Sequence, residues 1–275
     1  MHFLRVFNTL VAVACGLAVV SFSGAALAAK CGNTSAGFPA WVKEFRKEAA
    51  RNGIKERTLR QTLDNVTYAT KTIRLDRSQR SFKLSLNQFM QKRGASGIIA
   101  KGKRLKAQNA RLFAGIERRY GVPPGVLIAI WGMETGFGAF SGNQDAISAL
   151  ATLSYDCRRS AFFTRELYAA LEIIQRGELS RSQMRGAGHG ELGQTQFLPA
   201  NYLRYGVDGD GNGRRDLIGS RADALASTAN FLKAHGWRAG GGYQPGQTNF
   251  RAIQAWNAAG VYQKAIAIIG AKIDE

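Results

Sequence analysis

Apolar side chains recur at helical spacing through the first part of the chain, with charged residues between them. Over residues 39–54 and again over residues 96–121 their spacing is roughly that of one buried helix face. The second stretch ends at Gly121, a residue type common just after a helix. The apolar positions are Trp41, Val42, Phe45, Ala49 and Ile54 in the first stretch, and Ile98, Leu105, Leu112 and Ile116 in the second.

A different pattern follows, because residues 122–138 (VPPGVLIAIWGMETGFG) are almost all apolar or glycine. The two prolines suit the start of a helix and Gly136 suits its end, so the run predicts a buried core helix. Glu134 falls in the last turn, where its negative charge opposes the helix dipole. Burial and the dipole both raise the pKa of a carboxyl group, which is the profile of a general acid near neutral pH. A buried structural glutamate paired with an arginine is an equally good interpretation.

Beyond this helix the pattern predicts further helices and one irregular segment. Helices are predicted over residues 145–156, 160–179 and 221–237, and one or two more over residues 250–273. Residues 184–217 are rich in glycine and have few long apolar runs, so they predict a loop-rich insert with at most a short hairpin. The fold class is therefore mainly α, of α+β type, with a small irregular or β insert.

The length of the chain, 275 residues, allows one domain with a substantial core. No Ser/Pro-rich linker or long repeat interrupts it. We therefore expect residues 29–275 to form a single domain. Within it we expect a helical basic lobe over about 38–120 and an active-site core over about 121–275.

Residues 1–28 have the features of a cleaved export signal. An early arginine precedes an apolar stretch over residues 10–20, and Ala-Leu-Ala at 26–28 fits a cleavage site, so the mature chain begins near Ala29. The apolar stretch is too short to predict a membrane span. We therefore expect an exported, periplasmic protein. A lipid anchor on Cys15 is not expected, because the apolar run before that cysteine is very short.

Loss of the export signal removes Cys15 and leaves Cys31 and Cys157. An even pair of cysteines in an exported protein predicts a disulfide, because exposed free thiols fare poorly in oxidising compartments. This bond would link the N-terminus of the mature chain to its middle. Two unrelated free thiols are the alternative interpretation.

The net charge of +19 is unevenly placed, since residues 41–120 hold 21 Lys and Arg against 6 Asp and Glu. Such a block is typical of nucleic-acid binding, but the export signal argues against nucleic acid as a partner. An anionic envelope polymer or a membrane surface is a better match for an exported basic protein. A solvated basic helix face, which needs no partner, is the alternative.

Three segments taken together resemble one family of cell-wall enzymes. They are GMETGFGAFSGNQDAISALATLSYDCRRSAFFTREL (132–167), GELGQTQFLPANYLRYGVDGDGNGRRDL (190–217) and STANFLKAHGW (227–237). Over about residues 38–270 the chain is similar to the B-type lytic murein transglycosylases. The resemblance implies a lysozyme-like fold, no required cofactor, and cleavage of the MurNAc–GlcNAc β-1,4 bond of peptidoglycan with formation of a 1,6-anhydromuramoyl end. It also implies glycan strands and stem peptides as partners, and leaves any envelope protein partners open.

The resemblance implies a role for Glu134. Most glycoside hydrolases need two carboxylates, and Glu134 has no acidic neighbour between Glu117 and Asp145. In this family the glutamate of the E-T-x-x-G motif is the sole catalytic acid. It protonates the glycosidic oxygen and then acts as a base on the muramoyl C6 hydroxyl, which closes the anhydro ring. Glu134 is the matching residue.

Two further motifs match the family, each with plain packing as the alternative interpretation. ELGQTQFLP matches a loop of the substrate groove, which implies that Gln194 and Gln196 lie near the sugar. Gln196 matches the family glutamine better, whereas the position of Gln194 is often aromatic. Side-chain amides both donate and accept, which suits sugar hydroxyls and acetamides. CRRSAFF matches a basic pair that meets the stem peptide, so Arg158 and Arg159 are candidates for binding its carboxylates.

The closing segment IQAWNAAG matches an aromatic–asparagine pair of the family. The resemblance implies that Asn257 lies near Glu134, and Trp256 stands where tyrosine is commoner. Phe137 is a candidate for stacking against a sugar ring. Packing in the core is the alternative role for each of these residues.

Residues 207–219 (VDGDGNGRRDLIG) have the pattern of a calcium-binding loop. Side-chain oxygens at alternate positions, a glycine at the sixth position and a carbonyl at the seventh suit Ca²⁺. The candidate ligands are Asp208, Asp210, Asn212, the carbonyl of Arg214, and Asp216. Gly219 replaces the usual bidentate glutamate, and Asp223 either substitutes for it or caps the next helix. We therefore expect a structural calcium site, with an empty loop of Asx turns as the alternative.

Two rival functions stay open. One is a muramidase-type hydrolase that uses water, and its products would lack the anhydro end. The other is a non-catalytic wall-binding scaffold, which has no need to retain a costly acid such as Glu134 in an apolar run.

Overall fold

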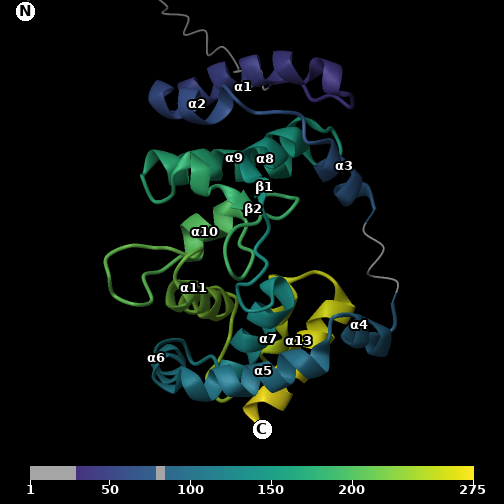
Figure 1. The fold of residues 1–275 in the computed structure, drawn as a ribbon, viewed down its shortest axis with the longest axis vertical. Helices are drawn as coiled ribbons and strands as arrows, with labels where there is room; N and C mark the ends of the chain where they lie inside the picture. The colour runs from purple at the N-terminus through teal and green to yellow at the C-terminus, as the bar shows by residue number, and fades with distance from the viewer. Residues whose placement is uncertain (1–28, 79–83) are drawn as a thin grey trace, which may run out of the picture.

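The computed structural model describes residues 29–78 and 84–275, and they are mainly helical, as predicted (Figure 1). The predicted export signal with its cysteine lies outside the described residues. The elements in chain order are η1 (Ser35–Gly37), α1 (Phe38–Arg51), α2 (Glu56–Leu63), α3 (Thr70–Arg77), α4 (Leu86–Lys92), α5 (Ala95–Gln108), α6 (Ala110–Tyr120), α7 (Pro124–Thr135), β1 (Gln144–Asp145), α8 (Ala146–Tyr155), α9 (Ser160–Gln175), η3 (Arg181–Gln183), β2 (Arg185–Gly186), α10 (Pro199–Tyr205), α11 (Arg221–Ala234), α12 (Phe250–Trp256) and α13 (Gly260–Asp274).

The β part is a single two-stranded antiparallel pair in the described chain, with Gln144 opposite Gly186 and Asp145 opposite Arg185. The predicted fold class, mainly α with a small β insert, is therefore confirmed. The glycine-rich insert also contains α10, a helix that the composition did not predict. It begins at Pro199, which suits a first helical turn, but it has only 7 residues and so carries little periodic signal. None of the described helices is both long and apolar enough to cross a membrane.

The helices gather in two groups that β1, β2 and α10 join (Figure 1). In one group, α1, α2 and α3 pack on the pair α8 and α9. In the other, α4, α5, α6, α11 and α12 surround α7 and α13, and α10 contacts both α9 and α11. The segment 38–120, predicted as one basic lobe, is thus shared between the two groups. The division of the domain near residue 120 stays a prediction.

Helix α7 is the centre of the second group, because every residue from Gly125 to Met133 is buried. Small residues let the neighbouring helices approach it closely. A Cβ on Gly125 would lie 2.2 Å from the carbonyl oxygen of Gly270 on α13, and a Cβ on Gly102 of α5 would lie 2.7 Å from Ile273. Contacts this short leave no room for a larger side chain. Glycine is therefore needed at position 125, where a Cβ would meet backbone, whereas at position 102 isoleucine side chains would have to shift.

Both ends of α7 are fixed by the rest of the fold. At its start, the Asp274 carboxylate accepts a hydrogen bond from the Gly125 N–H at 2.8 Å, which satisfies a free donor at the positive end of the helix. At its end, Gly136 adopts a left-handed conformation with φ of 59°, as the sequence predicts. Phe137 follows with φ of 68°, a conformation that is uncommon for any residue other than glycine. The chain thus turns sharply just after Glu134.

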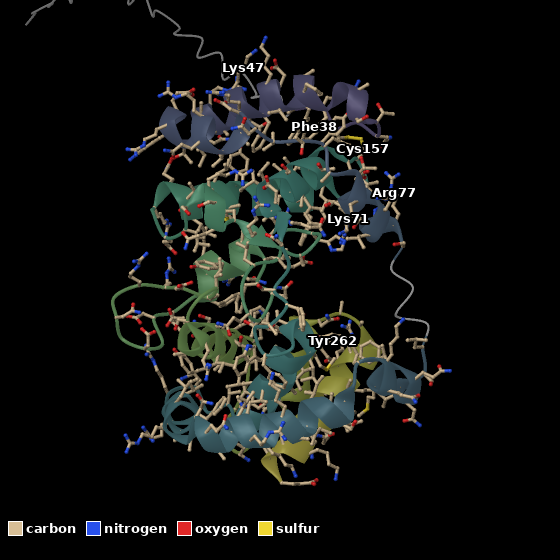
Figure 2. The ribbon with its side chains drawn as sticks, viewed as in Figure 1. Phe38, Lys47, Lys71, Arg77, Cys157 and Tyr262 are labelled. Atoms are coloured by element: carbon tan, nitrogen blue, oxygen red, sulfur yellow. A yellow bond between two sulfur atoms is a disulfide. The ribbon has the colours of Figure 1, made fainter. Side chains whose placement is uncertain are left out.

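The predicted disulfide between Cys31 and Cys157 is present, with a Cα–Cα distance of 5.1 Å (Figure 2). It joins the N-terminal segment to the turn between α8 and α9. Beside it, the Gly32 N–H donates to the Tyr155 carbonyl at 2.9 Å. The bond closes a loop across a sequence separation of 126 residues. Cross-linking so long a loop restricts the unfolded chain strongly.

We predict that replacing Cys31 and Cys157 together by serine lowers the free energy of unfolding by roughly 2 to 4 kcal/mol, because the unfolded chain regains its loop entropy. Urea unfolding of the oxidised protein and of the double variant measures the difference. Reductant is the control, since it should lower the stability of the unmodified protein and leave the variant unchanged. Equal stabilities for the two oxidised proteins would contradict the prediction.

Candidate active site

Glu134 lies in the last turn of α7, partly buried, and two side chains hold its carboxylate. The Tyr262 hydroxyl of α13 donates to Glu134 Oε1 at 2.6 Å, and the Trp256 indole of α12 donates to the same oxygen at 3.2 Å. Figure 2 shows Tyr262 on α13, where that helix runs beside α7. Three helices therefore converge on one carboxylate, and no arginine or lysine pairs with it among the described residues.

Burial raises the pKa of Glu134 to about 7, and the negative charge of Glu191 raises it further, while the hydrogen bonds from Tyr262 and Trp256 act in the opposite direction. Burial dominates because moving a carboxylate out of water costs more than two hydrogen bonds return. The carboxyl group can therefore both donate and accept a proton near neutral pH. The interpretation of Glu134 as half of an arginine ion pair is not supported.

Tyr262 is 4% exposed, and burial together with the charge of Glu134 raises its pKa well above the ordinary value. Its hydroxyl therefore stays protonated and remains a donor. The sequence analysis missed this residue. Only the packing of α13 against α7 reveals it, because Tyr262 lies 128 residues from Glu134 and belongs to no motif recognised in the sequence.

Glu134 opens into a cavity of about 520 Å³ between α7, α12 and the loop before α10. Of the residues predicted to bind substrate, four line this cavity with it: Arg159, Gln196, Trp256 and Asn257. The wall also contains Ala187, Glu191, Phe197, Leu198, Asn201, Phe231 and Ala258. The cavity thus presents amide, guanidinium and carboxylate groups beside aromatic surface, a combination suited to a sugar.

Neighbouring backbone holds two of the amide side chains of the cavity, those of Gln196 and Asn257. Gln196 has φ of 57°, and its Nε2 donates to the carbonyls of Ser141 at 3.1 Å and Gly193 at 2.9 Å. Asn257 Oδ1 accepts from the Ala259 N–H at 2.9 Å. Gln196 therefore keeps its Oε1 for a ligand, and Asn257 keeps its Nδ2. The strained backbone at Gln196 is typical of a residue that the surrounding structure holds in place for function.

Three predicted substrate residues do not line this cavity. Gln194 bridges within the protein, since its Oε1 accepts from the Trp131 indole at 3.1 Å and its Nε2 donates to the Ile218 carbonyl at 3.1 Å. Phe137 packs edge-to-face on Trp131, with ring centroids 5.5 Å apart. Arg158 binds Asp76 and is not among the residues of the cavity wall. The substrate roles of these residues stay predictions, and packing is what their contacts provide here.

Arg158 and Arg159 both bind the carboxylate of Asp76, the penultimate residue of α3. The Asp76 side chain is only 3% exposed, whereas the two arginine side chains are 46% and 42% exposed. Each guanidinium group has five N–H donors, so donors remain after this pairing. The basic pair is thus fixed in position by a buried acid, with Arg159 reaching the cavity.

The sequence analysis also missed a second acid in the cavity, Glu191. Its Oε2 accepts from the His189 N–H at 3.0 Å, and its Oε1 lies 3.3 Å from His189 Nδ1. Burial raises the pKa of Glu191, but these contacts with His189 outweigh it, so the net pKa lies below the ordinary value. Glu191 is therefore ionised in the same cavity where Glu134 is poised to hold a proton. The glycine-rich sequence around Glu191 did not predict that this residue lines the same cavity as Glu134.

The calcium-like loop brings three carboxylates together. Oxygens of Asp208, Asp210 and Asp223 lie within 4.8 Å of one another. Asp223 is fully buried and also caps the loop, accepting from the N–H of Gly209 at 2.8 Å and of Asp216 at 2.7 Å. Asp216 itself accepts from Gly219 N–H at 2.7 Å. Asp223 rather than Asp216 thus joins the acidic cluster, and this set of oxygen donors fits a calcium ion.

The Transglycosylase SLT domain model matches residues 37–246 of the chain. The membrane-bound lytic murein transglycosylase B of Escherichia coli is 39% identical over 119 residues, which is 43% of this chain and 33% of that protein. The match with this curated relative thus spans about a third of its length.

Solved structures match over most of the chain. SltB3 from Pseudomonas aeruginosa in complex with NAG-anhNAM-pentapeptide is 31% identical, with a TM-score of 0.80 over 86% of this chain and 79% of that one. Slt35 from Escherichia coli in complex with calcium is 22% identical, with a TM-score of 0.77 over 90% of this chain and 96% of that one. The predicted lysozyme-like fold of a lytic transglycosylase is therefore confirmed.

We predict that two substitutions move the pKa of Glu134 in opposite directions. Tyr262→Phe removes a hydrogen bond to the ionised carboxylate and raises the pKa, whereas Glu191→Gln removes a nearby negative charge and lowers it. The carbon-13 chemical shift of the Glu134 carboxyl group, followed against pH, measures both. A pKa that moves the same way in both variants would show that loosened packing, not these contacts, sets it.

Proposed function

The chain belongs to the Transglycosylase SLT domain family, as a B-type lytic transglycosylase, and from this membership we propose that it cleaves the MurNAc–GlcNAc β-1,4 bond of peptidoglycan. The reaction forms a 1,6-anhydromuramoyl end and needs no water. Support comes from the complexes of SltB3 with NAG-anhNAM-pentapeptide and with NAG-NAM-pentapeptide. Glycan strands carrying stem peptides are then the substrate of this chain.

The observation that carries the proposal is Glu134 in its cavity with a pKa of about 7. The protonated carboxyl group donates its proton to the glycosidic oxygen as the bond from the muramoyl C1 breaks. The resulting carboxylate then accepts the proton of the muramoyl C6 hydroxyl as that oxygen bonds to C1. One carboxyl group can perform both steps because its two protonation states are nearly equal in free energy near neutral pH.

The neighbouring side chains have supporting roles in this proposal. Tyr262 and Trp256 orient the carboxylate through their hydrogen bonds. Gln196 and Asn257 offer an amide oxygen and an amide N–H to sugar hydroxyls and acetamides. Arg158 and Arg159, already fixed by Asp76, offer their remaining donors to carboxylates of the stem peptide.

Export is part of the same proposal, because peptidoglycan lies outside the cytoplasm. We infer that residues 1–28 direct the chain to the periplasm and are removed there. The disulfide between Cys31 and Cys157 supports an oxidising compartment.

We predict that Glu134→Gln abolishes the release of anhydromuropeptides from purified peptidoglycan, because glutamine neither donates nor accepts the required proton. Mass spectrometry of the soluble fragments measures the products. Glu166→Gln is the matched control: it also removes a buried carboxyl group, one that accepts from the Ala200 N–H at 2.9 Å and does not line the cavity. Wall lysis that persists in Glu134→Gln would overturn the assignment. Binding without any lysis by the unmodified protein would favour the wall-binding scaffold.

One observation favours a second candidate reaction, hydrolysis with water. Glu191 is an ionised carboxylate in the same cavity as Glu134. Most glycoside hydrolases use such a pair, with one protonated and one ionised carboxyl group. In that reaction Glu191 would accept a proton from the attacking water. The products would end in a reducing sugar.

The same digests separate the two reactions. If Glu191 activates water, Glu191→Gln removes the reducing ends and leaves the anhydro ends. If only the transfer occurs, no reducing ends appear with the unmodified protein. Glu191→Gln then changes the pH dependence of the transfer reaction but not the kind of product.

We further propose that the loop 207–219 and Asp223 bind a structural calcium ion. The three converging carboxylates, with Asn212 and the carbonyl of Arg214 nearby in the loop, support this proposal. Calcium would supply positive charge that holds these oxygens together and fixes the start of α11.

We predict that Ca²⁺ raises the melting temperature and that a chelator lowers it, because the ion binds only the folded loop. Asp210→Asn should reduce the shift, since Asp210 is exposed and contributes one of the clustered carboxylates. Glu44→Gln, an exposed acid on α1, is the matched control and should leave the shift intact. Differential scanning calorimetry measures the effect, and a melting temperature indifferent to Ca²⁺ would remove the proposal.

A further inference from the structure

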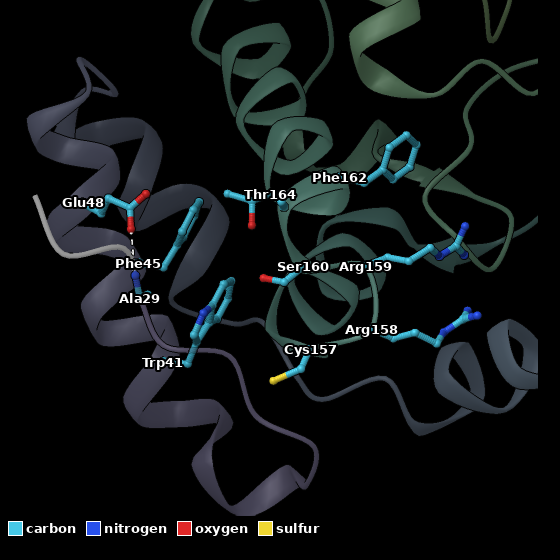
Figure 3. A pocket seen from close by; sticks show the side chains of 11 residues that line it. Ala29, Trp41, Phe45, Glu48, Cys157, Arg158, Arg159, Ser160, Phe162 and Thr164 are labelled. Carbon is cyan, nitrogen blue, oxygen red and sulfur yellow. Dashed lines mark hydrogen bonds between the residues drawn. The ribbon is translucent and has the colours of Figure 1, made fainter.

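The backbone nitrogen of Ala29, the first residue that the structure describes, lies 3.0 Å from Oε2 of Glu48 on α1 (Figure 3). Ala29 is half-buried and packs against the hydrophobic core. Figure 3 shows the contact at the rim of a cavity, with Trp41 and Phe45 projecting from α1 toward α9. The cavity has a volume of about 660 Å³ and includes Cys157 in its wall. The N-terminal segment is thus attached to α1 at this point.

A hydrogen-bonded side chain of a second helix holds the Glu48 carboxylate in position. The second oxygen of Glu48, Oε1, accepts a hydrogen bond from the Tyr168 hydroxyl of α9 at 3.0 Å. That hydroxyl in turn accepts from Asn52 Nδ2 at 2.8 Å. Burial and the nearby charge of Glu48 raise the pKa of Tyr168 to about 12, so its hydroxyl remains a donor. Two helices therefore orient this carboxylate so that Oε2 faces Ala29.

Glu48 has no cationic partner within the described parts of the chain, 29–78 and 84–275. No lysine, arginine or histidine side chain there lies within ion-pair distance of it. In a protein with a net charge of +19, an oriented and partly buried carboxylate left without a cation is unexpected. The atom that approaches its free oxygen is the backbone nitrogen of Ala29.

The charge of that nitrogen depends on the bond before it. While Ala28 precedes Ala29, the nitrogen is an amide with one N–H and no charge. Hydrolysis of the Ala28–Ala29 bond by a peptidase adds the hydroxyl of water to the Ala28 carbonyl carbon and a proton to the Ala29 nitrogen. The new amine has a pKa of about 7.7 to 8.0 and takes up a further proton near neutral pH.

We propose that Glu48 and Tyr168 form a binding site for an α-ammonium group, and that its ligand is the N-terminus of Ala29 produced by removal of residues 1–28. The cleavage turns a hydrogen bond between a neutral amide and the Glu48 carboxylate into an ion pair between Ala29 and Glu48. The charge on the donor adds Coulombic attraction to a hydrogen bond that already ends on a carboxylate, and partial burial limits the screening of this attraction by salt. Two interactions then attach the first three residues of the mature chain to the fold: the ion pair of Ala29 with Glu48 and the disulfide of Cys31.

The test compares two forms of the oxidised chain 29–275. One begins with a free Ala29, and the other carries Gly-Ser before it, which keeps the amide hydrogen bond and removes the charge. We expect the free form to melt roughly 2 to 4 °C higher, the shift that about 1 kcal/mol produces in a domain of this size. Glu48→Gln retains an oxygen that can accept from the Tyr168 hydroxyl but removes the negative charge. In this variant the two forms should have the same melting temperature. Glu44→Gln on the same helix should preserve the difference.

Three results would overturn the proposal. The two forms of the unmodified protein could melt at one temperature. Glu48→Gln could lower the melting temperature of both forms equally, which would mean that the carboxylate serves packing only. The N-terminal residue of the exported protein, determined by mass spectrometry, could be one other than Ala29. The proposal rests on the removal of residues 1–28 proposed above but not on the reaction at Glu134, since none of these measurements uses peptidoglycan.

Discussion

The close antiparallel contact of α7 with α13 is the constraint on which the candidate site depends. Glycines at the crossing let the two backbones approach, since a Cβ on Gly125 would meet the carbonyl oxygen of Gly270. At one end of the pair, Asp274 of α13 caps the start of α7. At the other end, Tyr262 of α13 reaches Glu134. A single helix pairing therefore sets both where α7 begins and how its only carboxylate is held.

That pairing also explains how so apolar a helix can carry an acid. The dipole of α7 and burial both oppose a charge on Glu134, and of the cations only Arg93 favours it, from beyond ion-pair distance. Two neutral donors, Tyr262 and Trp256, compensate for part of this cost. A cation in their place would lower the pKa and fix the group as a carboxylate. Neutral donors stabilise the ionised form only enough to leave both protonation states accessible.

The sequence predicted the features that are local in the chain. The apolar run ending in a glycine turn revealed the helix of Glu134, and the even cysteine count gave the pair of Cys31 and Cys157. It could not predict Tyr262 or Glu191, because their proximity to Glu134 arises from contacts between segments far apart in sequence. Gln194 shows the converse: its motif indicates a groove residue, but both ends of its amide are bonded within the protein. Motifs locate a loop near a site, whereas the direction of each side chain depends on tertiary packing.

The two acids of the cavity differ because their hydrogen-bond partners differ. Glu134 and Glu191 line one cavity, and two carboxylates so placed cannot both be ionised without mutual repulsion. The conflict is resolved by His189, whose backbone and imidazole nitrogens stabilise the charge on Glu191, while Glu134 receives neutral donors only. Imidazole Nε2 of the same histidine lies 3.7 Å from Asp76 Oδ1, and Asp76 also binds Arg158 and Arg159. The contacts that stabilise the charge on Glu191 and those that position the basic pair therefore meet at His189 and Asp76.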